Sequence, residues 1–132
     1  MLMKSKLHKS TVTLLKKIFG SNLQEEVNVN KLFSSYPKKN EHYDIVLPAF
    51  NIIIECHGEQ HRSFQTFGEK DIEKVATNLV RQQHRDKRKE EVAWENGWGY
   101  VIIWYDQFPE DEKNATLFLK TKIKEAIERI EL

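Results

Sequence analysis

The sequence lacks the features that would place it among disulfide-bonded, zinc-ribbon or membrane-spanning proteins. It contains one cysteine, Cys56, which excludes an internal disulfide and a zinc site built from several cysteines. Its formal net charge is only +1, so the molecule as a whole is not a basic polyanion binder. No apolar run approaches the roughly 20 residues that a transmembrane helix needs. We therefore expect a cytoplasmic protein with no signal peptide and no membrane contact.

The residues that are present suffice for one α/β domain. The chain has 132 residues, of which 39% are hydrophobic and 31% charged, and no repeat, low-complexity segment or linker divides it. We expect one domain over 1–132, with a core at about 10–107 and a C-terminal amphipathic helix at about 114–131. Capping residues and periodicity predict the other elements, namely helices from Ser10 or Thr11 to Phe19 and at 71–95, and strands near 25–29, 43–47, 50–56 and 100–105.

Two carboxylates are expected to meet where two of these strands pair. The short link at residues 48–49 indicates an antiparallel hairpin, which places Asp44 roughly opposite Glu55. Two adjacent carboxylates repel each other, and a bound Mg²⁺ or Mn²⁺ removes that conflict. We therefore predict a metal site formed by Asp44, Glu55 and the backbone carbonyl near Cys56. The alternative is that Asp44 is a turn residue and Glu55 a solvated group at a strand end.

Two histidines follow the second carboxylate. His57 shares a strand face with Glu55 because side chains alternate, and His61 lies four residues later, after Gly58, which permits a sharp bend. Either imidazole can take a proton from water or give one to a leaving oxygen. We predict a catalytic role for at least one of them and favour His57. The alternative for each is a surface or packing histidine.

The predicted helix at 71–95 carries polar residues on the stripe that should face the sheet. Gln83 and Asp86 interrupt that apolar stripe, so we predict that they point toward the polar site at the strand ends, where Asp86 can hold a histidine. The alternative is that the helix protrudes and this part is solvated. The same helix carries a basic run that is either a solvated face or a contact surface for phosphates: Arg81, Arg85, Lys87, Arg88 and Lys89.

With these residues in hand, the chain resembles the PD-(D/E)xK nuclease superfamily. Asp44 followed by Glu55-Cys56-His57 is similar to the Asp…Glu-x-Lys motif, with His57 where the lysine usually stands. The closer likeness is to the very-short-patch-repair-like branch and to the related phage homing endonucleases with the EDxHD motif. The resemblance covers about residues 10–107, including Arg85-Asp86 on the helix and the last strand.

The resemblance implies a restriction-endonuclease-like fold and roles for several residues. Asp44 would bind the metal, His57 and His61 would transfer protons or act as ligands, and Asp86 would assist them. Repair members of this branch also carry a zinc site of cysteine and histidine, which a single cysteine cannot form. The likeness therefore favours a free-standing or mobile-element nuclease over a mismatch-repair enzyme.

One departure from the family pattern concerns the first helix, which usually carries a glutamate. The matching turn here, residues 10–13, contains no acid, so either Glu25 or Glu26 substitutes or the site binds fewer metals.

These observations lead us to expect a Mg²⁺-dependent DNA endonuclease, with Mn²⁺ as a substitute. The rival interpretation is a catalytically inactive nuclease-fold module that holds DNA or a protein partner. A further rival is a nuclease for RNA or branched DNA. A chain of 132 residues leaves little room for long-site recognition, so we expect specificity to come from a homodimer, a partner or a separate module.

Overall fold

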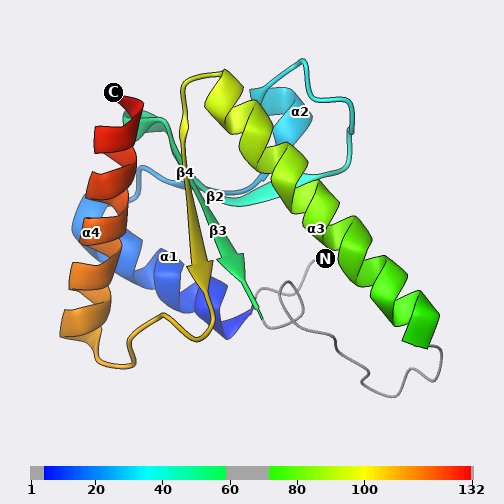
Figure 1. Cartoon of the computed structure of the whole chain (residues 1–132). Helices are drawn as coiled ribbons and strands as arrows, with labels where there is room; N and C mark the ends of the chain where they lie inside the picture. The colour runs from blue at the N-terminus through cyan, green and yellow to red at the C-terminus, as the bar shows by residue number, and fades with distance from the viewer. Residues whose placement is uncertain (1–4, 59–71, 132) are drawn as a thin grey trace.

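The computed structural model of the protein describes residues 5–58 and 72–131 as a mixed four-stranded β-sheet flanked by helices (Figure 1). The strands are β1 (Gln24–Asn28), β2 (His42–Leu47), β3 (Ile52–His57) and β4 (Gly99–Trp104). The helices are α1 (Lys6–Phe19), α2 (Val29–Leu32), α3 (Ile72–Glu95) and α4 (Glu112–Ile130), with a short 3₁₀ helix, η1 (Pro48–Phe50), between β2 and β3. The predicted α/β class with a mixed sheet of four strands is confirmed.

The sheet has the strand order β1-β2-β3-β4. β2 pairs antiparallel with both β1 and β3, whereas β3 and β4 are parallel and are connected through α3. The predicted hairpin and the predicted parallel crossover are therefore both present. In the hairpin Ile45 pairs with Ile54, so the next residues outward, Asp44 and Glu55, come to lie side by side.

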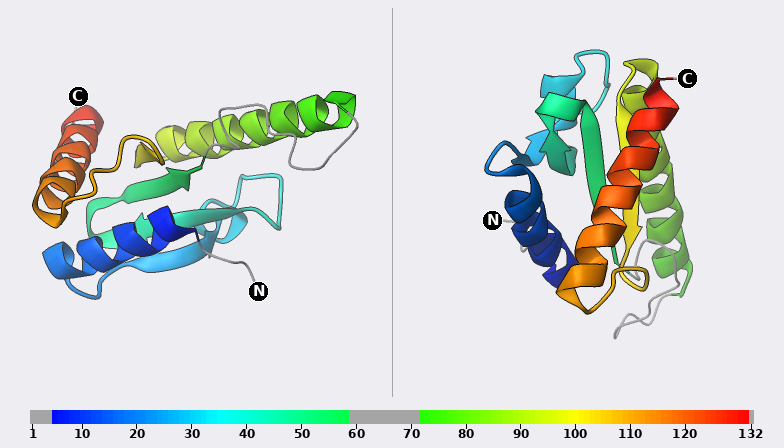
Figure 2. Two further views of the ribbon diagram at one scale, coloured as in Figure 1. Left: turned by 90° about the horizontal axis from the view of Figure 1, so that it is seen from below. Right: turned by 90° about the vertical axis from the view of Figure 1, so that its left-hand side faces the viewer.

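Helices cover both faces of the sheet. α1 and α4 pack on one face, where the fully buried core residues include Leu15, Ile54 and Leu119. α2 and α3 pack on the other, around Tyr43 and Ile53. Figure 2 shows α1 and α3 on opposite sides of the sheet. Within the described ranges, none of the helices has the length and apolarity needed to cross a membrane.

The helix starts differ from the sequence prediction. α1 begins at Lys6, because Ser5 is its N-cap and accepts a hydrogen bond from the backbone N–H of His8. α4 is capped by Asp111 rather than by Asn114, which instead donates its backbone N–H to Asp111. The one-turn helix α2 was not predicted. The predicted helix ends at Gly20 and at Gly97 are confirmed, and both glycines have a positive φ of 77° and 76°.

Candidate metal centre and acid–base site

Asp44 and Glu55 are joined through the backbones of their strands. The Cys56 N–H donates to Oδ2 of Asp44 at 2.8 Å, and the Asp44 N–H donates to Oε2 of Glu55 at 3.3 Å. These side-chain bonds continue the β2–β3 hairpin where its described ladder ends, at Ile45 and Ile54. The N–H of Cys56 faces β2, and so does its carbonyl, because both groups of a strand residue point to the same side. The predicted convergence of Asp44, Glu55 and the Cys56 backbone is therefore present.

Glu55 is buried and paired with a lysine. Its side chain is 2% exposed, and its Oε1 lies 2.7 Å from Nζ of Lys89 and accepts a hydrogen bond from the Tyr100 hydroxyl at 3.3 Å. Burial, with a smaller contribution from the charge of Asp44, raises the pKa of Glu55 to about 8 even though the ammonium of Lys89 lowers it in part. One of the two predicted carboxyl groups thus lies inside the protein against a lysine. The alternative of a solvated strand-end glutamate is wrong.

Lys89 reaches this position because it lies on the sheet-facing side of α3. It is 8% exposed, its ammonium also lies over the ring of Tyr43 at 5.7 Å, and its carbonyl accepts a hydrogen bond from the Tyr43 hydroxyl at 2.7 Å. The sequence predicts Lys89 among the phosphate-contacting cations, because the charged run at 85–89 does not indicate which of its residues face the sheet. Its burial beside Glu55 removes it from that surface.

A second group of ligand-type side chains gathers around the other carboxylate oxygen of Asp44, Oδ1. His8 of α1, Glu26 of β1 and Asp44 each offer one ligand atom, and these atoms all lie within 4.8 Å of one another. His8 Nδ1 is 3.9 Å from Glu26 Oε1 and 4.0 Å from Asp44 Oδ1. His8 Nε2 is 3.1 Å from Glu25 Oε1. Glu25 and Glu26, named above as substitutes for a helix glutamate, both contact this histidine.

Glu26 adopts an unusual backbone conformation at this point. Its φ is +52°, in the left-handed region that side chains other than Gly, Asn and Asp rarely adopt. The described pairing of β1 with β2 skips it, since Glu25 pairs with Ile45 and Val27 with Tyr43. A strained residue in a broken ladder is typical of functional sites, and here it carries one of the three ligand-type groups.

His57 and Asp86 come together from β3 and α3. His57 is 2% exposed, its Nε2 lies 4.0 Å from Oδ2 of Asp86, and its ring meets Trp104 edge to face at a centroid distance of 5.0 Å. The predicted approach of Asp86 to a strand-end histidine is therefore present. Gln83 is exposed, and its predicted orientation toward the site stays a prediction. His61 lies outside the described residues.

The remaining cations of α3 divide between two settings. Arg81, Arg85 and Lys87 are exposed. Arg88 is partly buried, and its guanidinium lies 3.5 Å from Oε2 of Glu41, whose other oxygen accepts a hydrogen bond from the Tyr36 hydroxyl.

The sequence did not predict His8 as a residue of the site. It lies upstream of the segment read as the first helix, and nothing in its neighbours marks it as buried. The signal that could have found it is Ser5, a capping residue one helical turn earlier, which extends α1 far enough to bring His8 to the sheet.

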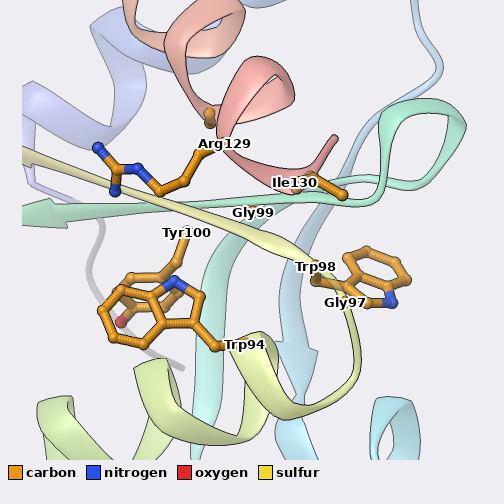
Figure 3. A pocket seen from close by; sticks show the side chains of 8 residues that line it. Trp94, Gly97, Trp98, Gly99, Tyr100, Arg129 and Ile130 are labelled. Carbon is orange, nitrogen blue, oxygen red and sulfur yellow. The ribbon is translucent and has the colours of Figure 1, made fainter. Parts of the chain in front are cut away.

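A separate hollow of about 390 Å³ lies at the opposite end of β4 (Figure 3). It is lined by Trp94 of α3, Arg129 and Ile130 of α4, Gly97 of the turn, and Gly99 and Tyr100 at the start of β4. None of the ligand-type residues described above lines this hollow, so it is not part of the candidate centre.

No protein-family model and no curated protein matches the chain.

Proposed function

We propose that this protein is a metal-dependent endonuclease that hydrolyses phosphodiester bonds in DNA. The placement of His8 carries the proposal. Its Nδ1 is directed at Glu26 and Asp44 while its Nε2 lies 3.1 Å from a carboxylate oxygen of Glu25. A histidine that binds a metal through one ring nitrogen usually donates the other ring N–H to a carboxylate or carbonyl. Glu25 provides that second partner.

The donor set fits a small divalent cation. One imidazole nitrogen and two carboxylate oxygens would come from His8, Glu26 and Asp44, and separations of 3.9–4.8 Å need only small side-chain shifts to close around an ion. Carboxylates suit Mg²⁺ and Mn²⁺, and the imidazole favours Mn²⁺ of the two. A bound cation supplies Lewis-acid stabilisation of the negative charge that develops on a phosphate under attack.

The other residues of the site support the same reaction. The Cys56 N–H fixes the orientation of the Asp44 carboxylate, and Lys89 places a positive charge beside Glu55. Lys89 thereby takes the place of the lysine that the nuclease motif carries at the position of His57. His57, with Asp86 beside it, accepts the proton of the attacking water. The compartment we propose is the cytoplasm, in line with the free thiol of Cys56.

A second candidate function is an inactive nuclease-fold module that binds DNA or a protein. The ion pair between Glu55 and Lys89 favours it, because a buried carboxylate held 2.7 Å from an ammonium resembles an interior structural pair. In this alternative the protein binds its partner equally well with and without a divalent cation.

A substrate panel separates these functions. Labelled duplex DNA, branched DNA, single-stranded DNA and RNA are incubated with Mn²⁺, with Mg²⁺ or with EDTA, and the parent is compared with His8→Gln. The proposed function predicts cation-dependent cleavage of a DNA substrate that falls sharply in the variant. Glu128→Gln, at an exposed residue of α4, is the control and retains activity. Cation-independent binding without cleavage of any substrate supports the inactive module instead.

A further inference from the structure

A groove of about 510 Å³ lies beside the candidate centre, between α3 and the loop that leads into β2. In Figure 1 this loop runs from α2 past α3 to the start of β2. Lys38 and Asn40 line the loop side, and Arg81, Arg85 and Arg88 line the helix side. All of these except Arg88 are classed as exposed.

The groove is strongly positive although the chain as a whole is nearly neutral. Four of its lining side chains are lysine or arginine, and the acid among them, Glu41, is already engaged by Arg88 and by the Tyr36 hydroxyl. A cluster of unneutralised guanidinium groups on a surface attracts polyanions. Arginine in particular binds phosphate oxygens through two parallel hydrogen bonds.

The spacing of the arginines suits a row of phosphates rather than a single anion. Arg81 and Arg85 lie four residues apart on one helix face and are separated by roughly 6 Å along the axis at a rise of about 1.5 Å per residue. A DNA strand carries one phosphate per about 3.4 Å of helix axis, so this pair matches about two successive phosphates. No Phe, Tyr or Trp is among the described residues that line the groove, which favours contacts to the backbone over stacking on bases.

Both walls of the groove adjoin, along the chain, segments that carry residues of the candidate site. On α3, Arg85 is followed by Asp86, which faces His57, and Arg88 is followed by Lys89, which pairs with Glu55. The loop wall ends at the start of β2, the strand of Asp44. A strand lying in the groove therefore lies against the helix that carries Asp86 and Lys89 and against the loop that enters β2.

We propose that this groove holds the phosphate backbone of the DNA strand that enters the candidate centre, without reading its base sequence. The inference rests on the proposed function and adds the path of the substrate. It assigns phosphate contacts to Arg81 and Arg85, places Lys38 on the facing wall, and gives Arg88 the task of holding Glu41 away from the substrate.

The test measures binding of a fluorescent DNA duplex by the full chain carrying Asp44→Asn, so that bound DNA stays intact. In this background Arg81→Gln with Arg85→Gln is compared with Lys120→Gln with Lys124→Gln, which removes two equally exposed charges from α4. Affinity is measured over a series of salt concentrations. The groove pair is expected to weaken binding about tenfold or more and to lower the slope of log K against log salt by about 2, whereas the α4 pair changes neither.

Equal effects of the two pairs, or a groove pair with an unchanged salt slope, overturn the inference. A preference for one duplex sequence over others that disappears in the groove pair also overturns it, because backbone contacts carry no sequence information. The result is separable from the proposed function. Selective loss of binding in a protein whose parent form never cleaves DNA supports the groove and refutes the nuclease. A groove variant that cleaves DNA and binds it as tightly as the parent refutes the groove and supports the nuclease.

Discussion

Nζ of Lys89 lies 2.7 Å from Oε1 of Glu55, and the two side chains are 9% and 2% exposed. This pair ties α3 to β3. It places a cation next to the Glu55 carboxylate, which accepts a hydrogen bond from the backbone N–H of Asp44. A buried charge is tolerated when a partner and hydrogen bonds compensate it. Removing the partner leaves the full cost of desolvating that charge uncompensated. The pair therefore links the stability of the fold to the chemistry of the site.

Lys89→Met is expected to lower the free energy of unfolding by about 3–5 kcal/mol at pH 9, where the Glu55 carboxyl is ionised and would be left without its partner. Adding Glu55→Gln should restore much of that loss, because the buried charge is then gone. Urea unfolding of the four members of the cycle measures both effects. Lys87→Met on the exposed side of α3 is the matched control, expected within about 0.5 kcal/mol of the parent. Equal losses for the two lysine variants would show that the pair contributes nothing specific.

The stability of the cation-free protein should fall as pH rises from about 4.5 to about 8. Burial raises the pKa of Glu55 from 4.5 to about 8, so within this window the folded protein holds a proton that the unfolded chain has released. Above that window the dependence levels off. The measurement is urea unfolding in EDTA across this range, with Glu55→Gln for comparison. The pH dependence of the variant should lack this contribution, and parallel curves for the two proteins would contradict the assignment.

Glu26→Gly is expected to change stability and cation binding in opposite directions. Glycine adopts the φ of +52° without strain, so the free energy of unfolding in EDTA should rise by about 1 kcal/mol. Removing a carboxylate from the group around His8 should weaken Mn²⁺ binding about tenfold or more. Calorimetric Mn²⁺ titration and urea unfolding give the two quantities. Glu25→Gly, where φ is not positive, should lose stability instead, and a destabilised Glu26→Gly protein would refute the strain argument.

Asp86→Asn is expected to lower the cleavage rate about tenfold or more while the protein stays folded, because it removes the anion beside the imidazole of His57. The acidic limb of the pH–rate profile should also move to lower pH, since the protonated imidazole loses a stabilising neighbour. A purely structural role for Asp86 predicts no movement of that limb. Glu91→Gln, an exposed acid on the same helix, provides the comparison and should leave the profile unchanged.

Most of the fold could be predicted from local signals. β-branched runs, a short link after Leu47 and the glycines at 20 and 97 were enough to give the hairpin, the crossover and the helix ends, although the link spans 48–51 rather than the predicted 48–49. The start of α1 was predicted too late because Ser10 and Thr11 look like capping residues. Ser5 takes that role, and Thr11 is instead fully buried against the sheet.

The candidate site was predictable only where strand geometry fixes it. Alternation and the hairpin register bring Asp44, Glu55 and His57 together, as the sequence indicates. The contributions of His8 and Lys89 depend on the rotation and docking of two helices, which a local pattern does not encode. Lys89 is an example. In the sequence it belongs to a charged run with Arg85 and Arg88, whereas in the structure it is buried against Tyr43.

In the proposed function, Asp44 belongs to a cation-dependent catalytic centre for DNA. The most direct measurement is nicking of supercoiled plasmid by the parent and by Asp44→Asn, each with Mn²⁺, with Mg²⁺ and with EDTA. We predict nicking by the parent that needs the cation and is more effective with Mn²⁺, and none by a folded Asp44→Asn protein. A folded parent protein that leaves every form of DNA intact in both cations would show that the protein is not a nuclease for DNA.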